Sequence, residues 1–270
     1  MSEKPIGFVI LNYKTWEKTI ECVRSIRATV PADKIIVVVD NASPNESAEQ
    51  LAALAGTEEY EFISSGKNGG YSFGNNIGFQ SVKDRCDIVV FTNNDIVFTD
   101  GAAEAMAAAF HEETLAVGPL VKLPTGELTN PPTLKTQSML QLLGLKSREN
   151  IIAPWEKGKV FQVVGCCFAV NAKLFEAVGC FDDHVFLYHE EYILGKKAQD
   201  AGLEILFEPN AVVIHDHGST AGNNSEFVDR EMARSAAYYF RAYEGKNPAL
   251  FLTAAEIKIA IKRMMGKYEN

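Results

Sequence analysis

The sequence has no apolar run long enough to cross a membrane and no surplus of positive charge. No stretch of 18 apolar residues occurs, so we expect no transmembrane helix. The apolar run near the N-terminus is short and leads directly into polar residues, which is not the layout of a signal peptide. The formal net charge is −9, whereas phosphate binding across a surface requires clustered Lys and Arg. We therefore expect a cytoplasmic protein that does not bind nucleic acid.

Cysteine pairs and two common nucleotide-binding fingerprints are missing as well. The five cysteines include one adjacent pair and no Cys-x-x-Cys, so the sequence predicts reduced, mostly buried thiols without zinc or disulfides. No G-x-x-x-x-G-K-[ST] occurs, which excludes a P-loop. No G-x-G-x-x-G follows the first expected strand, which argues against a dinucleotide site of the NAD type.

What the first hundred residues do contain is a regular alternation of apolar runs and helical patterns. Runs rich in Val and Ile occupy 7–13, 34–41, 60–65 and 87–95, and segments with helical spacing lie between them at 15–29, 47–54 and 74–82. Continuous apolar runs indicate strands covered on both faces. Their alternation with helices predicts an α/β protein with a mostly parallel central sheet.

The remaining chain is less regular, and we expect one domain in two halves rather than two domains. Strands are expected at 114–121, 160–170, 204–207 and 211–214, and a long loop with one short helix at 122–158. Helices are expected at 101–111, from Asn171 to Gly179, at 190–201 and from about 226 to the end. Three helix starts have candidate caps: a capping box of Ser47 and Gln50, Asp100, and Asn171.

Polar residues end each of the first four expected strands. They are Asn12–Tyr13, Asp40–Asn41, the segment 66–70, and Asn93–Asn94–Asp95. Ligands of open parallel sheets bind beyond the carboxyl ends of the strands, so these residues predict a nucleotide pocket. Without a P-loop, a divalent cation held by the Asp95 carboxylate would neutralise a diphosphate. The alternative interpretation of 93–95 is an Asx turn that ends a strand.

Six motifs occur together in one order, and that order resembles family 2 glycosyltransferases, most closely their bacterial rhamnosyltransferase-like members. The motifs span about residues 6–220 and read VILNY, VVVDNAS, NGGYSFGNNIG, TNNDIVF, VGCCFAV and FLYHEEYILGKKAQDAG. The resemblance implies a GT-A fold, a nucleotide-diphosphate-sugar donor, a divalent cation (Mn²⁺ or Mg²⁺), and inversion at the anomeric carbon.

The resemblance also assigns donor-binding roles. Asp40 would accept the N3–H of uracil or thymine, although a turn role in D-N-A-S is the alternative. Lys197 takes the place of an arginine that is common in the family and would contact the diphosphate or the acceptor. The other candidate donor contacts are Asn12, Tyr13, Asn41, Asn68, Gly69, Asn75 and Asn94.

The same resemblance supplies the metal ligands and the base. Asp95 matches the metal-binding aspartate of the family's D-x-D motif, in which Asn93 replaces the first aspartate. His215 resembles a metal-binding histidine of the family, with a structural role as the alternative, and imidazole suits Mn²⁺ better than Mg²⁺.

Glu191 matches the general base of the family, in preference to Glu190. The alternative is that both glutamates only complement the dipole of the helix that they begin. Carboxylates at a helix N-terminus are expected to stay ionised.

The C-terminal segment carries a basic amphipathic pattern. Ile257, Ile261 and Met264 or Met265 share one helical face, and four cations lie largely off it. Such a helix could lie on the inner face of the cell membrane, pack on the domain, or pack on a second subunit of a homodimer. We expect a GT-A domain over 1–225, with a nucleotide-binding half at 1–98 and an acceptor half at 99–225, followed by a helical extension at 226–270.

The predicted function is metal-dependent, inverting transfer of a sugar, with a rhamnose-like sugar favoured. The donor would be a dTDP- or UDP-sugar, and the acceptor a cell-surface glycan or a lipid-linked acceptor. One alternative is a sugar-nucleotide nucleotidyltransferase, which would require a Gly-rich basic loop after the first strand that VILNYKTW lacks. The other is a sugar-nucleotide-binding protein without catalytic activity.

Overall fold

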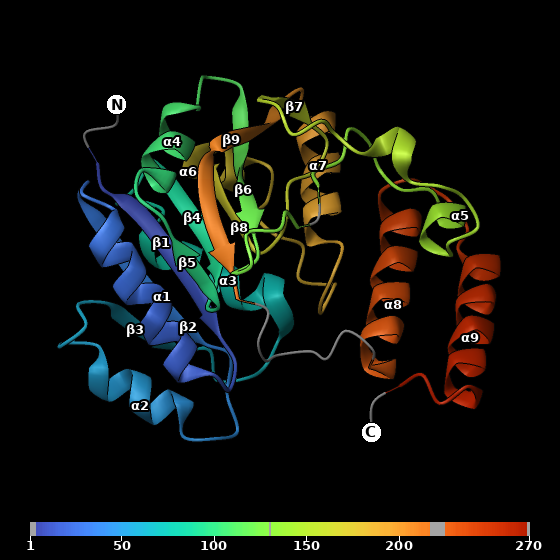
Figure 1. Cartoon of the computed structure of the whole chain (residues 1–270), viewed down its shortest axis with the longest axis horizontal. Coiled ribbons are helices and arrows are strands. Elements are labelled where there is room, and N and C mark those ends of the chain that lie inside the picture. The colour runs from blue at the N-terminus through green and yellow to red at the C-terminus, as the bar shows by residue number, and fades with distance from the viewer. Residues whose placement is uncertain (1–3, 130, 217–224, 269–270) are drawn as a thin grey trace.

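The computed structural model describes residues 4–129, 131–216 and 225–268, and a mixed sheet forms its centre (Figure 1). The strand order is β3-β2-β1-β4-β8-β6-β9-β5, with β7 also paired to β9. The strands are β1 (Ile6–Asn12), β2 (Lys34–Asp40), β3 (Glu61–Ser64), β4 (Ile88–Asn93), β5 (Ile96–Phe98), β6 (Thr114–Lys122), β7 (Gly158–Val160), β8 (Cys167–Asn171) and β9 (Glu204–His215). The helices are α1 (Trp16–Thr29), α2 (Ser47–Leu54), α3 (Gly70–Val82), α4 (Ala102–Ala108), α5 (Met139–Leu142), α6 (Ala172–Ala177), α7 (Glu190–Asp200), α8 (Glu226–Ala242) and α9 (Ala249–Met264), with a 3₁₀ turn at Glu149–Ile151.

The predicted parallel sheet is confirmed for the first four strands of the order, β3, β2, β1 and β4. Asn12 at the end of β1 lies opposite Asp40 at the end of β2, and Leu11 lies opposite Asn93 at the end of β4. The polar strand ends therefore meet at one edge, as the alternation predicted.

The second half extends this sheet with strands of both directions. β8 runs antiparallel to β4 and β6, whereas β6 and β9 are parallel. The run predicted as one strand at 160–170 is divided between β7 and β8, and the two predicted strands at 204–207 and 211–214 form the single strand β9. A register shift between β6 and β9 absorbs the residues between those two segments.

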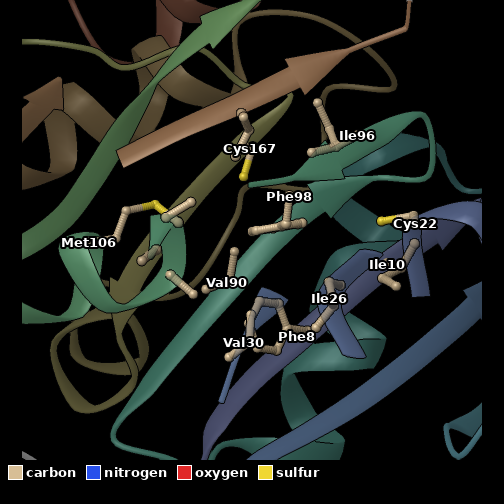
Figure 2. Close-up of a cluster of buried hydrophobic side chains, with 14 of the residues drawn as sticks. Phe8, Ile10, Cys22, Ile26, Val30, Val90, Ile96, Phe98, Met106 and Cys167 are labelled. Atoms are coloured by element: carbon tan, nitrogen blue, oxygen red, sulfur yellow. The ribbon is translucent and has the colours of Figure 1, made fainter. Parts of the chain in front are cut away.

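Apolar side chains cover both faces of the sheet, which explains the continuous Val and Ile runs. Figure 2 shows one cluster, in which side chains of β1, β4 and β5 meet those of α1 and α4. Val90 belongs to this cluster, and its neighbour Phe91 belongs to the cluster on the opposite face. Phe91 there contacts Phe175 and Phe181, with ring centroids 5.2 and 4.8 Å apart.

Only one of the three predicted helix caps is present as expected. Asn171 accepts a hydrogen bond from the Leu174 amide at 3.1 Å and caps α6. Ser47 lies inside the first turn of α2, where its hydroxyl is buried without a hydrogen bond, so the predicted capping box is wrong. α4 is preceded by Gly101 in a left-handed conformation rather than by Asp100 (φ +76°).

Glycines let α3 lie close to the sheet and to the segment before α7. A Cβ on Gly74 would lie 2.3 Å from Leu11, and one on Gly78 would lie 2.3 Å from Val9. Gly70 begins α3 with φ +89°, and a Cβ there would lie 2.1 Å from the Phe186 carbonyl oxygen. That oxygen accepts a hydrogen bond from the Tyr71 amide at 2.9 Å. The start of α3 is thus fixed against the chain that leads into α7.

The predicted C-terminal helical segment consists of two helices, α8 and α9. Gly245 and Pro248 lie in the connection, where a left-handed glycine and a proline interrupt the helix. Figure 1 shows α8 and α9 at the end of the molecule near α5 and α7, away from α1 and α2. None of the helices in the described ranges has both the length and the apolar character that crossing a bilayer requires.

We expect Gly70→Ala to destabilise the protein more than Gly66→Ala. Both glycines have positive φ, so either alanine costs about 1–2 kcal/mol of backbone strain. Nothing lies within 4 Å of a Cβ on Gly66, whereas one on Gly70 meets the Phe186 carbonyl, which adds about 1–3 kcal/mol. Urea unfolding of both variants measures the difference, and equal losses would contradict the close contact between α3 and the segment before α7.

Candidate functional site

A connected group of buried and partly buried polar side chains joins the ends of β1, β2 and β4, and we call it the polar seam. The Asn12 amide nitrogen donates to Asp40 Oδ1 at 2.7 Å, and the Asn12 amide oxygen accepts from Thr19 Oγ1 at 2.8 Å. The Asn94 amide nitrogen lies 3.2 Å from the same Asn12 oxygen. The members of the seam are Asn12, Thr15, Thr19, Asp40, Ser43 and Asn94.

Asp40 is completely buried, and its contacts are those of a turn residue. Its Oδ2 accepts from the Ser43 amide at 2.9 Å, and its Oδ1 accepts from the Ser43 hydroxyl at 2.6 Å. Asn94 is also buried, and its amide nitrogen lies 2.7 Å from Thr15 Oγ1. The structure therefore brings Asn12, Asp40 and Asn94 together as predicted, but it turns them toward one another rather than toward solvent.

The segment after β3 is held by Asn41. Its amide nitrogen lies 3.0 Å from both Asn68 Oδ1 and the Gly70 carbonyl oxygen. Asn68 Oδ1 also accepts from the Gly70 amide at 3.1 Å. Asn68 remains exposed, and Gly69 and Tyr13 are partly exposed, so a ligand could reach these three predicted donor contacts.

The Asp95 carboxylate and the His215 imidazole meet at the end of β9. Ile96 pairs with His215 in the sheet, and Asp95 Oδ1 lies 3.1 Å from His215 Nε2. Both side chains are about nine-tenths buried. The Asp216 amide donates to the Asp95 carbonyl at 2.9 Å, and the Asp216 carboxylate pairs with Lys18 of α1 at 2.9 Å. Two residues that are 120 positions apart in the sequence thus lie side by side.

These two side chains fit a divalent cation that prefers oxygen and imidazole ligands. Asp95 Oδ1 is buried and lies against His215 Nε2, so a carboxylate oxygen and an imidazole nitrogen are placed where they could share one cation. The pair supplies only two ligands, and His217 lies outside the described residues. Asn93 is partly exposed, and its amide donates to the Cys166 carbonyl at 2.8 Å.

Within the described ranges, the one group of three ligating side chains consists of Asp182, Asp183 and His184. The Asp182 carboxylate in that group already accepts hydrogen bonds from the hydroxyls of Tyr238 and Tyr243, at 2.9 and 2.6 Å.

Two glutamates begin α7 after a strained backbone. Tyr188 and His189 have φ of +70° and +71°, in the left-handed region that costs about 1–2 kcal/mol for a residue other than glycine. Glu190 is buried, and its Oε1 has no hydrogen bond. Glu191 is partly exposed, and its Oε1 lies 3.3 Å from the Cβ position of Gly165. A side chain at Gly165 would therefore crowd the Glu191 carboxylate.

Burial affects the pKa values of Glu190 and Glu191 more strongly than the helix dipole does. Loss of hydration raises the pKa of Glu190, and the neighbouring Glu191 charge raises it further. Burial also raises the pKa of Glu191, although a backbone hydrogen bond opposes this. The expectation that the helix N-terminus keeps both groups ionised is therefore wrong for Glu190, whose pKa rises to about 8. Burial lowers the pKa of His189 to about 4, so its imidazole is neutral at pH 7.

The residues Gly165 and Cys166 connect the glutamates to the Asp95 turn. The Gly165 carbonyl accepts from the Tyr71 hydroxyl at 2.7 Å, while the Cys166 carbonyl accepts from the Asn93 amide. Burial raises the pKa of the Cys166 thiol, and the charges of Cys167, Asp95 and Glu191 act in the same direction. Cys166 thus lies within electrostatic reach of both Asp95 and Glu191.

Two other predicted contacts lie elsewhere. Asn75 is completely buried inside α3, where its amide nitrogen donates to the Tyr71 carbonyl at 3.1 Å. The Lys197 amine donates to the carbonyl oxygens of Gly179 and Cys180 at 3.2 and 2.7 Å. Lys197 lies six positions after Glu191 in α7, which is about 9 Å along the axis and on a different face. The ligand contact of Lys197 stays a prediction.

Sequence reasoning missed several residues that shape the site. Tyr71, Thr15, Thr19 and Ser43 received no role, although Tyr71 lies inside the motif NGGYSFGNNIG. Asn76 joins α3 to Phe181, whose ring contacts Phe91, through two hydrogen bonds to the Phe181 backbone at 3.0 and 3.1 Å. The run of small polar residues around each strand end was the sequence feature that could have identified Thr15, Thr19 and Ser43.

Comparison with known proteins finds matches in sequence. The family described as glycosyl transferase family 2 matches residues 8–179. The low-salt glycan biosynthesis hexosyltransferase Agl10 of Haloferax volcanii is 24% identical over 208 residues, which cover 74% of this chain and 63% of that protein. The N-acetylglucosaminyl-diphospho-decaprenol L-rhamnosyltransferase of Mycobacterium tuberculosis is 28% identical over 153 residues, 51% of this chain and 50% of that protein. The chain thus spans less than two thirds of the length of both curated relatives.

Solved structures match the fold. GalNAc-T7 with UDP, GalNAc and Mn²⁺ aligns with a TM-score of 0.66 at 15% identity, covering 89% of this chain and 49% of that one. The mannosyltransferase PcManGT from Pyrobaculum calidifontis, in complex with GDP-Man and Mn²⁺, aligns with a TM-score of 0.63 at 14% identity, covering 96% and 70%. These likenesses confirm the predicted GT-A fold.

We expect the buried Glu190 carboxyl group to make stability fall as pH rises. Its raised pKa means that the folded chain binds this proton more tightly than the unfolded chain. The contribution is fully present below about pH 4.3, the ordinary glutamate value, and is lost as pH rises through the folded pKa. The slope is at most about 1.4 kcal/mol per pH unit for one proton.

Urea unfolding between pH 5 and pH 8 measures this slope. Glu190→Gln should flatten it and make the variant more stable than the parent at pH 8. Glu49→Gln, at an exposed position of α2, is the matched control and should leave the slope unchanged. A parental slope in Glu190→Gln would show that this carboxyl group is not the source.

Proposed function

The chain belongs to glycosyl transferase family 2, and we propose from that premise that it transfers a sugar from a nucleotide-diphosphate donor to an acceptor hydroxyl with inversion. The observation that carries the proposal is the placement of Gly165–Cys166. Glu191 lies against Gly165, and the Cys166 carbonyl holds the Asn93 amide two residues before Asp95. A candidate base and a candidate diphosphate anchor therefore flank the same short segment.

In this proposal, the polar seam shapes the donor site rather than binding the base through Asp40. The seam fixes the turns that follow β1, β2 and β4, and Tyr13, Asn68 and Gly69 at their surface contact the nucleotide. Tyr13 already lies beside the Lys14 amine, 4.9 Å from its ring centroid, so the ring offers one face to a base. Asn41 holds the 68–70 backbone in place for this contact.

Asp95 and His215 would hold a divalent cation, Mn²⁺ in preference to Mg²⁺ because one ligand is imidazole. When bound, the cation neutralises the diphosphate that leaves the sugar. Asp95 contributes a buried carboxylate oxygen, and β9 places the His215 imidazole 3.1 Å from it. Both Mn²⁺-containing structural neighbours agree with this choice.

Glu191 would act as the general base that accepts the proton of the acceptor hydroxyl. Its partial exposure allows an acceptor to reach it, whereas Glu190 is buried. A raised pKa makes Glu191 a stronger base than an ordinary glutamate, which favours proton transfer near neutral pH. The nearby Tyr71 hydroxyl and the small Gly165 define the space around the carboxylate.

We propose a rhamnose-like sugar from a dTDP- or UDP-linked donor, and a cell-surface glycan or lipid-linked acceptor. The support is the rhamnosyltransferase and the glycan hexosyltransferase among the relatives. The catalytic unit would comprise residues 1–225, with nucleotide-binding and acceptor halves divided near residue 98. The helices of 226–270 lie beyond the family match, and we assign them to attachment of the cytoplasmic enzyme rather than to catalysis.

Two alternatives are less well supported by the geometry. A sugar-nucleotide nucleotidyltransferase would require a basic, glycine-rich loop after β1, but that position holds the turn of Tyr13, Lys14 and Thr15. A silent binding protein would not require the buried Glu190 carboxyl group, whose Oε1 has no hydrogen bond and is costly to retain.

We expect Glu191→Gln to reduce kcat by about 10²–10⁴-fold with little change in donor affinity, because it removes proton acceptance alone. Steady-state kinetics with a dTDP- or UDP-sugar measure this effect. Glu49→Gln should retain parental kcat. Parental turnover by the Glu191→Gln variant would show that Glu191 is not the general base.

We expect Asp95→Ala to abolish Mn²⁺-dependent stabilisation by the nucleotide diphosphate. At a hundredfold excess over its dissociation constant, a ligand stabilises the folded chain by about 2.7 kcal/mol. Thermal unfolding with UDP or dTDP, with and without Mn²⁺, measures the shift. Asp100→Ala, at an exposed position five residues along, should keep the parental shift. If Asp95→Ala keeps the parental shift in melting temperature, the cation does not bind at Asp95.

A further inference from the structure

α9 carries apolar side chains on two faces, and α8 covers only one of them. Phe251, Ala255 and Ile259 are buried on the inner face. A second row of apolar residues consists of Leu250, Ile257, Ile261 and Met264. Their spacing of seven, four and three residues places them along one side of the helix. We call this row the outer face of α9, and its exposed fractions are 87% for Leu250, 57% for Ile257, 46% for Ile261 and 79% for Met264.

The α5 segment adds exposed apolar groups beside this helix. The Lys258 amine of α9 donates to the Leu143 carbonyl at 3.3 Å, which joins the two elements. Leu140 and Leu145 on either side of Leu143 are 53% and 72% exposed. Contiguous exposed apolar groups of this kind mark an interaction surface.

An apolar cavity of about 140 Å³ opens among the same helices. Its size compares with the apolar cavity of about 150 Å³ in another protein that stays dry and accepts benzene. His189, directly before the glutamates of α7, also lines it. The apolar lining includes Leu142, Leu143, Met232, Ala236, Phe251 and Ile259.

The charge of this end of the molecule is opposite to that of the chain as a whole. Lys146, Lys258 and Lys267 have no carboxylate within ion-pair distance among the residues that the structure describes. The other cations of α9 are neutralised by α8, since Lys262 pairs with Asp229 at 2.7 Å and Arg263 pairs with Glu226. Unpaired lysines beside exposed apolar groups fit an anionic, partly apolar partner on a protein of net charge −9.

A second copy of the chain fits this surface poorly. A two-fold dimer would bring the same patch against itself, so the unpaired lysines would face one another. A bilayer with anionic head groups satisfies both features, because the apolar side chains enter the interface and each lysine near the surface contributes about 1 kcal/mol.

We propose that the outer face of α9 and the adjoining 140–146 segment dock on an anionic phospholipid bilayer. Docking by this face brings the start of α7 to the membrane side of the molecule, because His189 lines the cavity between α5, α8 and α9. The proposal specifies the attachment that the proposed function assigns to residues 226–270, and it does not require transferase activity.

Co-sedimentation with vesicles tests the docking surface directly. The full chain should bind vesicles of phosphatidylglycerol and phosphatidylcholine and should bind pure phosphatidylcholine at least tenfold more weakly, with binding to the anionic vesicles falling as salt rises. Ile257→Glu/Ile261→Glu should lose at least tenfold of the anionic binding. Leu128→Glu, at a position that is 45% exposed beyond β6, should bind as the parent does.

A second variant keeps the apolar face and removes charge. Lys146→Gln/Lys267→Gln should weaken binding to anionic vesicles several-fold and leave the melting temperature unchanged. Absence of binding to anionic vesicles, or parental binding by both double variants, would overturn the proposal. So would a dimer in vesicle-free solution that Ile257→Glu/Ile261→Glu converts to a monomer, because the face would then belong to a second copy.

Discussion

The buried amide of Asn12 is the contact on which the ligand-binding edge depends. It joins the end of β1 to Asp40 on β2, to Thr19 on α1 and to Asn94 after β4. Removing it would take one hydrogen bond from a partner on each of three elements, at about 0.5–1.5 kcal/mol for each bond. Because Asn94 directly precedes Asp95, this network also sets the place where Asp95 meets His215 on β9. The polar seam therefore fixes the turns that carry the site, and its buried members do not form the surface of the site.

The second half of the site depends on close backbone contacts. Gly70 allows α3 to touch the Phe186 carbonyl, and the Tyr71 hydroxyl reaches the Gly165 carbonyl. Two consecutive residues, Tyr188 and His189, then turn the chain through left-handed conformations into α7. Strain of this kind persists only where the surrounding structure holds it, and it is concentrated at functional sites. Here it directs Glu191 toward Gly165 and leaves Glu190 buried.

Buried acidic groups give the site its electrostatic character. The dipole of α7 favours ionised carboxylates, yet burial raises the pKa of Glu190 and Glu191. Desolvation is the larger effect because the dipole is worth only about 0.3–1 kcal/mol at an exposed position. Asp95 adds a buried carboxylate oxygen, which lies 3.1 Å from His215 Nε2. A folded chain that retains buried acidic groups gives up stability at these positions.

The sequence by itself determined the alternation of strands and helices, the polar ends of the first four strands, and the family to which their order belongs. These follow from local patterns, since apolar runs and strand-ending residues are readable without long-range contacts. Only the tertiary structure decided which of those side chains are buried and which stay exposed. It turned Asn94 and Asp40 inward, directed Lys197 to the backbone at Gly179, and brought His215 to Asp95. Side-chain direction and the pKa of a buried carboxyl group depend on packing between segments far apart in the chain, which no local pattern encodes.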